Sequence, residues 1–174
     1  MPPRLRKAVL TMHVVTSMGW LGAVLAYIAL DVTAVASSDT ARIRAAYLAM
    51  ELTITYAIVP LALASVIIGI VNALGTSWGL FRHYWVLVKL LLTLVATTVL
   101  LLEMQTTRSL AEAAGSGADP LGLPGTLPHS IGGLVVLLVV TILSIYKPSG
   151  LTRYGWRKQQ QRRNPGEQSA ALAA

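Results

Sequence analysis

The sequence contains no cysteine among its 174 residues, and this absence narrows the chemistry open to the chain. Disulfide bonds, c-type haem attachment and iron–sulfur ligation all need cysteine sulfur, so none of them is available. Zinc and copper also lose their usual soft ligand. Histidine, methionine, carboxylates and lysine are the side chains left to build a site.

Charged residues are scarce as well. Only 12% of the residues are charged, whereas 55% are hydrophobic, and a typical soluble domain is about one quarter charged. This balance is typical of a membrane protein. No Ser–His–acid set, phosphate-binding loop or dinucleotide fingerprint stands out. The sequence therefore assigns no catalytic residue and leaves open whether the protein is an enzyme.

Long apolar runs dominate what is present. Four of them are long enough to cross a bilayer, for which about 20 mostly apolar residues are needed. We therefore predict an all-α fold, an integral membrane four-helix bundle over residues 1–148, and a basic, partly disordered cytoplasmic tail over residues 149–174. The predicted helices cover about 8–36, 45–74, 84–104 and 129–147.

The net charge of +7 is unevenly distributed. Basic residues precede the first apolar run, occur in the second loop and follow the fourth run, so the positive-inside rule predicts that both termini are cytoplasmic. In the tail they are interspersed with Tyr154 and Trp156. We interpret the tail as an anchor on anionic lipids rather than as a nucleic-acid-binding segment.

His13 is the residue that most directly indicates a site. It lies inside the first apolar run, where an ionisable ring is costly and by default marks a site or faces the protein interior. His13, Trp20, Tyr27 and Asp31 recur at spacings of seven, seven and four residues. This periodicity predicts that they share one face of the first helix.

The helical rise places His13, His83 and Lys89 in the inner half of the membrane, with Trp20 nearby. Two neutral imidazoles on facing helices are a usual way to hold haem b, so we predict that His13 and His83 ligate its iron, with His13 and Lys89 as the alternative pair. Each of the three residues also has a plainer interpretation, which needs no cofactor. In this interpretation His13 donates a hydrogen bond to a backbone carbonyl of the second helix, for example one freed by Pro60. Lys89 then extends to the headgroups, and His83 is an ordinary interfacial residue.

A second polar cluster is predicted near the outer boundary of the membrane. Carboxylates with one imidazole can bind a divalent metal or relay protons. The plainer interpretation is that these side chains cap helices or meet water at the helix ends. The cluster comprises Asp31, Glu51, Glu103 and His129.

The segment MHVVTSMGWLGAVL resembles the first helix of the CopD-like membrane superfamily, which includes copper-resistance D proteins and the HemJ-type protoporphyrinogen oxidases. Members share an early histidine followed by an aromatic and small-residue motif, here at residues 20–23. They also share a later helix similar to WVLVKL at residues 85–90. The YKPSGLTRYGW segment at residues 146–156 is similar to the tail of small uncharacterised bacterial members.

The resemblance implies a bacterial inner-membrane location, haem b binding, and functional roles for His13 and Lys89. The chain also departs from the pattern. The HemJ-type enzymes have further polar and aromatic residues where residues 24–27 here are VLAY. Copper-resistance proteins have more helices and more histidine and methionine. The resemblance therefore assigns neither activity.

Three functional hypotheses follow. The first is a membrane protein that binds haem b in the bundle for electron transfer or haem handling. The second is a cofactor-free structural or accessory subunit, which packs through small-residue helix faces against a membrane-protein partner or a second copy. The third and weaker hypothesis is a metal or proton pathway through the outer polar cluster.

Overall fold

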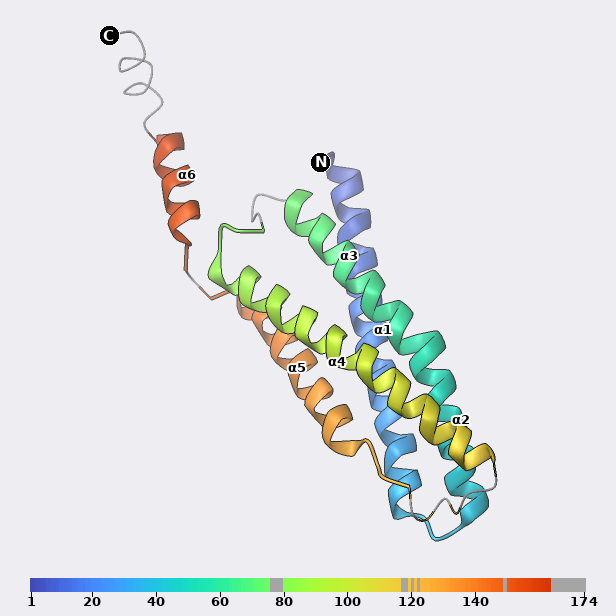
Figure 1. Ribbon diagram of the computed structural model, residues 1–174. Coiled ribbons are helices and arrows are strands. Elements are labelled where there is room, and N and C mark those ends of the chain that lie inside the picture. The colour runs from blue at the N-terminus through green and yellow to red at the C-terminus, as the bar shows by residue number, and fades with distance from the viewer. Residues whose placement is uncertain (76–79, 117–118, 120, 122, 149, 164–174) are drawn as a thin grey trace, which may run out of the picture.

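The computed structural model describes residues 1–75, 80–116, 119, 121, 123–148 and 150–163, and its principal elements are helices (Figure 1). An isolated antiparallel β-bridge joins His83 to Leu151. The helices in chain order are α1 (Pro3–Ala36), α2 (Thr40–Thr53), the π-helical turn η1 (Ile54–Ile58), α3 (Val59–Gly75), α4 (Tyr84–Gly115), α5 (Leu127–Tyr146) and α6 (Arg153–Arg163).

Four helical segments are long and apolar enough to cross a membrane, which confirms the predicted all-α, four-helix integral membrane fold. The second of them is α2, η1 and α3 taken together as one continuous helix, Thr40–Gly75. Large apolar side chains are exposed along all four segments. In a bilayer these side chains contact lipid, since lipid tails are as apolar as the side chains themselves.

The helices form a closed ring in which α1 and α4 stand on one diagonal. Helix α1 contacts α2, α3 and α5, while α4 contacts α2, α3 and α5. We call the end of the bundle that holds the start of α1 the amino end, and the opposite end, where α1 meets α2, the distal end. The N-terminus and helix α6 both lie at the amino end (Figure 1).

Helices α1 and α3 run antiparallel and approach closely. The hydroxyls of Ser17 and Ser65 are 2.8 Å apart across this seam. A Cβ at Gly19 would lie 3.3 Å from Leu61 Cδ2, so the leucine side chain would have to shift by a few tenths of an ångström to admit a larger residue. This close approach is what small residues provide in membrane helices, which lack a hydrophobic driving force between them.

One face of α1 supplies much of the core. Its buried residues follow each other at three- and four-residue spacings, as expected for a single helix face. The predicted face is confirmed for three of its four members, while His13 is only half-buried. The buried residues of α1 are Thr16, Trp20, Val24, Tyr27, Asp31 and Ala34.

The second membrane helix contains a π-helical turn just before Pro60. The backbone N–H of Val59 bonds to the carbonyl of Ile54, five residues earlier. Proline has no N–H to donate and its ring crowds the preceding turn, so the regular ladder has to be rearranged there. The sequence predicted a backbone carbonyl freed by Pro60, and the structure accommodates the proline with this wider turn.

Helix α4 extends eleven residues beyond the end predicted at residue 104, into a segment that we expected to be loop. The extension buries Thr107, Leu110, Ala111 and Ala114 against the core. The helix end was predicted too early because charged and small residues end the apolar run at this point, although the helical periodicity continues.

The tail begins as an ordered segment that packs on the start of α4. Thr152 donates its N–H to the Arg82 carbonyl at 3.0 Å and its hydroxyl to the Phe81 carbonyl at 2.6 Å. Gly155 lies against the same Arg82 carbonyl, which leaves no room for a Cβ. Helix α6 then extends away from the bundle (Figure 1). The disorder predicted for residues 164–174 falls outside the described residues.

Candidate functional site

His13 lies in the seam between α1 and α3. A Cβ added at Gly69 would be 2.9 Å from His13 Cε1, so the ring fills the space that this glycine leaves open. The Nδ1 atom is buried and has no hydrogen-bond partner. The ring also has a backbone hydrogen-bonding interaction with Ser65 on α3, as the plainer interpretation of His13 expects, and the Lys89 ammonium group lies within electrostatic reach of it. The ring therefore packs on the second membrane helix while one of its nitrogens is left unsatisfied.

Lys89 is held between α4 and α5. Its ammonium group donates to the Ser144 hydroxyl at 2.7 Å, and that hydroxyl donates to the Val140 carbonyl at 2.8 Å. The side chain thus has a partner inside the bundle, on the neighbouring helix. This contact takes the place of the predicted extension to the headgroups.

His83 occupies the N-cap position of α4. It pairs with Leu151 of the tail, and its ring centroid is 6.3 Å from that of Trp85. The start of α4 lies apart from α1 (Figure 1). The structure therefore does not bring His83 to the α1–α3 seam as a second ligand for His13. Of the predicted inner set, only Lys89 remains within electrostatic reach of His13.

The distal end holds a buried hydrogen-bond network centred on Asp31, whose side chain is fully buried. Thr126 donates to this carboxylate twice, from its N–H at 3.3 Å and from its hydroxyl at 2.8 Å. The Ser130 hydroxyl lies 3.2 Å from the same carboxylate. A buried carboxylate is costly unless it is hydrogen-bonded in this way. Asp31 thereby fixes the start of α5 to α1.

Tyr27 connects this network to α4. Its hydroxyl is 2.9 Å from the Thr107 hydroxyl and 3.1 Å from the Thr126 hydroxyl. Because Thr126 gives its proton to Asp31, Tyr27 must donate to Thr126 and accept from Thr107. The result is a chain of donors that runs across the bundle diagonal and ends on the carboxylate. Such buried networks specify a unique arrangement when every member is satisfied.

Glu103 and His129 form a second polar pair at the distal end, with 3.4 Å between Glu103 Oε1 and His129 Nδ1. Glu51 is half-exposed on α2 and takes no part in this pair. Among the residues that the structure describes, no three histidine or acidic side chains lie close enough to hold a metal ion together. The predicted outer cluster is thus divided into a structural aspartate, the Glu103–His129 pair and a separate glutamate.

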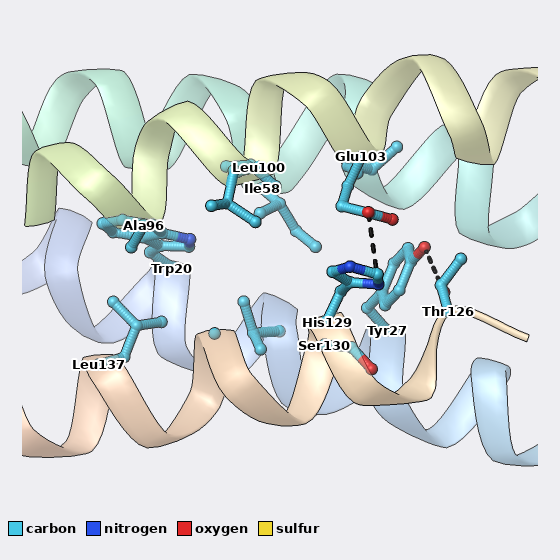
Figure 2. A pocket seen from close by; sticks show the side chains of 14 residues that line it. Trp20, Tyr27, Ile58, Ala96, Leu100, Glu103, Thr126, His129, Ser130 and Leu137 are labelled. Carbon is cyan, nitrogen blue, oxygen red and sulfur yellow. Dashed lines mark hydrogen bonds and ion pairs between the residues drawn. The ribbon is translucent and has the colours of Figure 1, made fainter.

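A pocket of about 70 Å³ lies between α1, η1, α4 and α5, with Glu103 and His129 at one end and Trp20 toward the other (Figure 2). Trp20, predicted to flank a cofactor near His13, lines this pocket instead. The lining residues are Trp20, Val24, Tyr27, Ile54, Ile58, Ala96, Val99, Leu100, Glu103, Thr126, His129, Ser130, Gly133 and Leu137.

Sequence reasoning missed three hydroxyl residues that organise the distal end: Thr107, Thr126 and Ser130. Thr126 precedes Leu-Pro at the start of α5, and a threonine before a proline-initiated helix is a helix-start signal. Thr107 was hidden because its segment was expected to be loop. The helix-start signal at Thr126 does not indicate that these hydroxyls contact Tyr27 and Asp31 on α1.

Comparisons with protein-family models, with curated proteins and with solved structures give no match. The resemblance to the CopD-like superfamily therefore remains a prediction from the sequence motifs.

Proposed function

We propose that this integral membrane protein binds haem b through His13, for electron transfer or haem handling at a bacterial inner membrane. The observation that carries the proposal is the buried Nδ1 of His13, which has no hydrogen-bond partner. In a water-free membrane an unsatisfied imidazole nitrogen is costly, and an axial bond to iron is one way to satisfy it. The sequence resemblance supports the same residue.

Of the residues present, His13 would hold the iron, and Lys89, which lies within electrostatic reach of the ring, would place a positive charge near the bound group. Haem b would supply one-electron redox chemistry there. His83, at the start of α4, is no longer part of the proposal. Gly69 gives the His13 ring room that a larger residue would remove.

The alternative function is a cofactor-free structural or accessory subunit, and one observation favours it. The His13 ring already packs against the backbone of α3 at Gly69, as a residue whose only role is helix packing would do. In this alternative the α1–α3 seam is complete without any bound group. The two functions differ in whether purified protein carries a chromophore.

The visible spectrum separates them. The protein is expressed in haem-replete cells, purified in mild detergent and measured in its oxidised and reduced forms. A Soret band that is lost in His13→Ala and retained in His129→Ala supports haem at His13, since His129 lies at the opposite end of the bundle. A wild-type protein with no Soret band supports the cofactor-free alternative.

We also propose that the amino end faces the cytoplasm and meets anionic lipid. Basic residues gather at this end because the start of α1, the segment before α4 and helix α6 all lie there. Each basic side chain near an anionic surface contributes about 1 kcal/mol of attraction. Tyr154 and Trp156 are exposed beside them, as expected for interfacial anchors.

A further inference from the structure

The distal pocket has one apolar end and one acidic end. Trp20, Ala96 and Leu137 lie together at one end, while Glu103 and His129 lie at the other (Figure 2). The His129 side chain is 59% exposed, whereas that of Glu103 is only 18% exposed. The polar end thus reaches the surface at His129, and Glu103 stands behind it inside the pocket.

Glu103 has one oxygen with no partner. Its Oε1 faces His129, but its Oε2 is buried and forms no hydrogen bond. An unpaired carboxylate oxygen in an apolar environment is strongly unfavourable, so a bound donor would be stabilised there. A group with a positive charge would gain most, because charge-assisted hydrogen bonds are the strongest.

The other polar groups around the pocket are already engaged. Asp31 accepts from Thr126 and faces Ser130, and the Tyr27 hydroxyl is bonded to two threonines. The η1 turn contributes only Ile54 and Ile58. Among the described lining residues, the pocket therefore offers a ligand the buried acceptor Glu103 Oε2, beside the His129 ring, and otherwise mostly apolar and aromatic surface.

We propose that this pocket binds a small lipophilic amine, with its ammonium group on Glu103 Oε2 and its hydrocarbon part toward Trp20 and Leu137. The aromatic ring of Tyr27 beside Glu103 adds a surface that attracts cations (Figure 2). Mostly apolar walls with a few convergent polar groups are the usual lining of a ligand site. This proposal is independent of haem binding at His13.

The test uses the full-length protein in detergent and calorimetric titration with n-propylamine, an amine small enough for a pocket of about 70 Å³. Its neutral analogue 1-propanol has nearly the same shape and lacks the charge. The amine is expected to bind saturably and at least about tenfold more tightly than the alcohol, since hydrogen bonds to charged groups are worth that much. Equal affinities, or no saturable binding of the amine, would overturn the proposal without relying on any variant.

Matched variants locate the site. Glu103→Gln is expected to weaken amine binding about tenfold or more, while Glu51→Gln, on a glutamate that does not line the pocket, leaves it unchanged. Gly133→Leu is expected to block the pocket, because Gly133 lines it and has open space around its Cβ position; Gly132→Leu, equally open but outside the lining, is the control. Unchanged affinity in Glu103→Gln and Gly133→Leu would place the amine elsewhere and contradict the proposal.

Discussion

Asp31 and Thr126 are 95 residues apart in the sequence, yet the Asp31 carboxylate accepts both the N–H and the hydroxyl of Thr126. The first membrane helix thereby holds the start of the last one. The Thr126 hydroxyl also accepts a hydrogen bond from the Tyr27 hydroxyl, so one threonine connects two side chains of α1. Through these hydrogen bonds Thr126 connects α1 to the start of α5 at the distal end.

Replacing Thr126 with valine should destabilise the protein. The change keeps the shape of the side chain but removes the hydroxyl that donates to Asp31 and accepts from Tyr27, and we expect the loss of these two buried hydrogen bonds to cost about 2–3 kcal/mol. Thermal unfolding in detergent measures the effect. Thr126→Ser should retain most of the stability, and Thr98→Val, at an exposed threonine bonded only to the Leu94 carbonyl, serves as the control. Equal losses in Thr126→Val and Thr98→Val would contradict the network.

Replacing Gly69 with alanine should also destabilise the protein, because the new Cβ would lie 2.9 Å from the His13 ring. The expected loss is about 1–3 kcal/mol, typical of overpacking. Gly132→Ala, where the Cβ position is open, should instead stabilise α5 by about 0.5–1 kcal/mol. In the double variant His13→Ala/Gly69→Ala, the cost of the alanine at Gly69 should largely disappear. Strict additivity of the two changes would show that the ring and Gly69 do not touch.

The orientation of the bundle in the membrane can be measured cleanly because the chain has no cysteine. Single cysteines are introduced at Ser38, at the distal end, and at Tyr154, in α6. Intact cells are treated with a membrane-impermeant maleimide. We expect labelling of Ser38→Cys in intact cells and labelling of Tyr154→Cys only after lysis. The reverse pattern would refute cytoplasmic termini.

The attachment of the tail to the bundle should depend on Gly155. A methyl group there would clash with the Arg82 carbonyl, so Gly155→Ala should release α6 and the segment that precedes it. Limited trypsin digestion should then cleave faster at Arg157 and Lys158. Gly150→Ala, whose Cβ would make only an ordinary contact with Tyr84, should digest at the wild-type rate. Identical digestion of both variants would argue against docking.

Features that depend on local sequence could be predicted. The apolar runs gave the four membrane helices, and the periodicity of Trp20, Tyr27 and Asp31 gave the buried face of α1. Asp39 directly precedes α2 and caps it by accepting from the N–H groups of Ala41 and Arg42. In each case the physical cause lies within a few residues of its effect.

Features that depend on the order of the helices around the bundle could not be predicted from the sequence. Depth along a helix follows from counting residues, and on that basis His13, His83 and Lys89 were grouped. Which helix stands next to which does not follow from depth. Helices α1 and α4 occupy one diagonal, so His13 meets Gly69 of α3, whereas Lys89 meets Ser144 of α5. The pocket was unpredictable for the same reason, since its walls come from four elements.

The haem content of purified protein tests the central claim most directly. A pyridine haemochrome assay on protein from haem-replete cells gives the moles of haem b per mole of chain. With haem b held at His13, the wild-type protein and Gly132→Ala should both carry haem b at close to one per chain, and His13→Ala should carry almost none. Wild-type protein without haem b, or His13→Ala with an undiminished content, would contradict it.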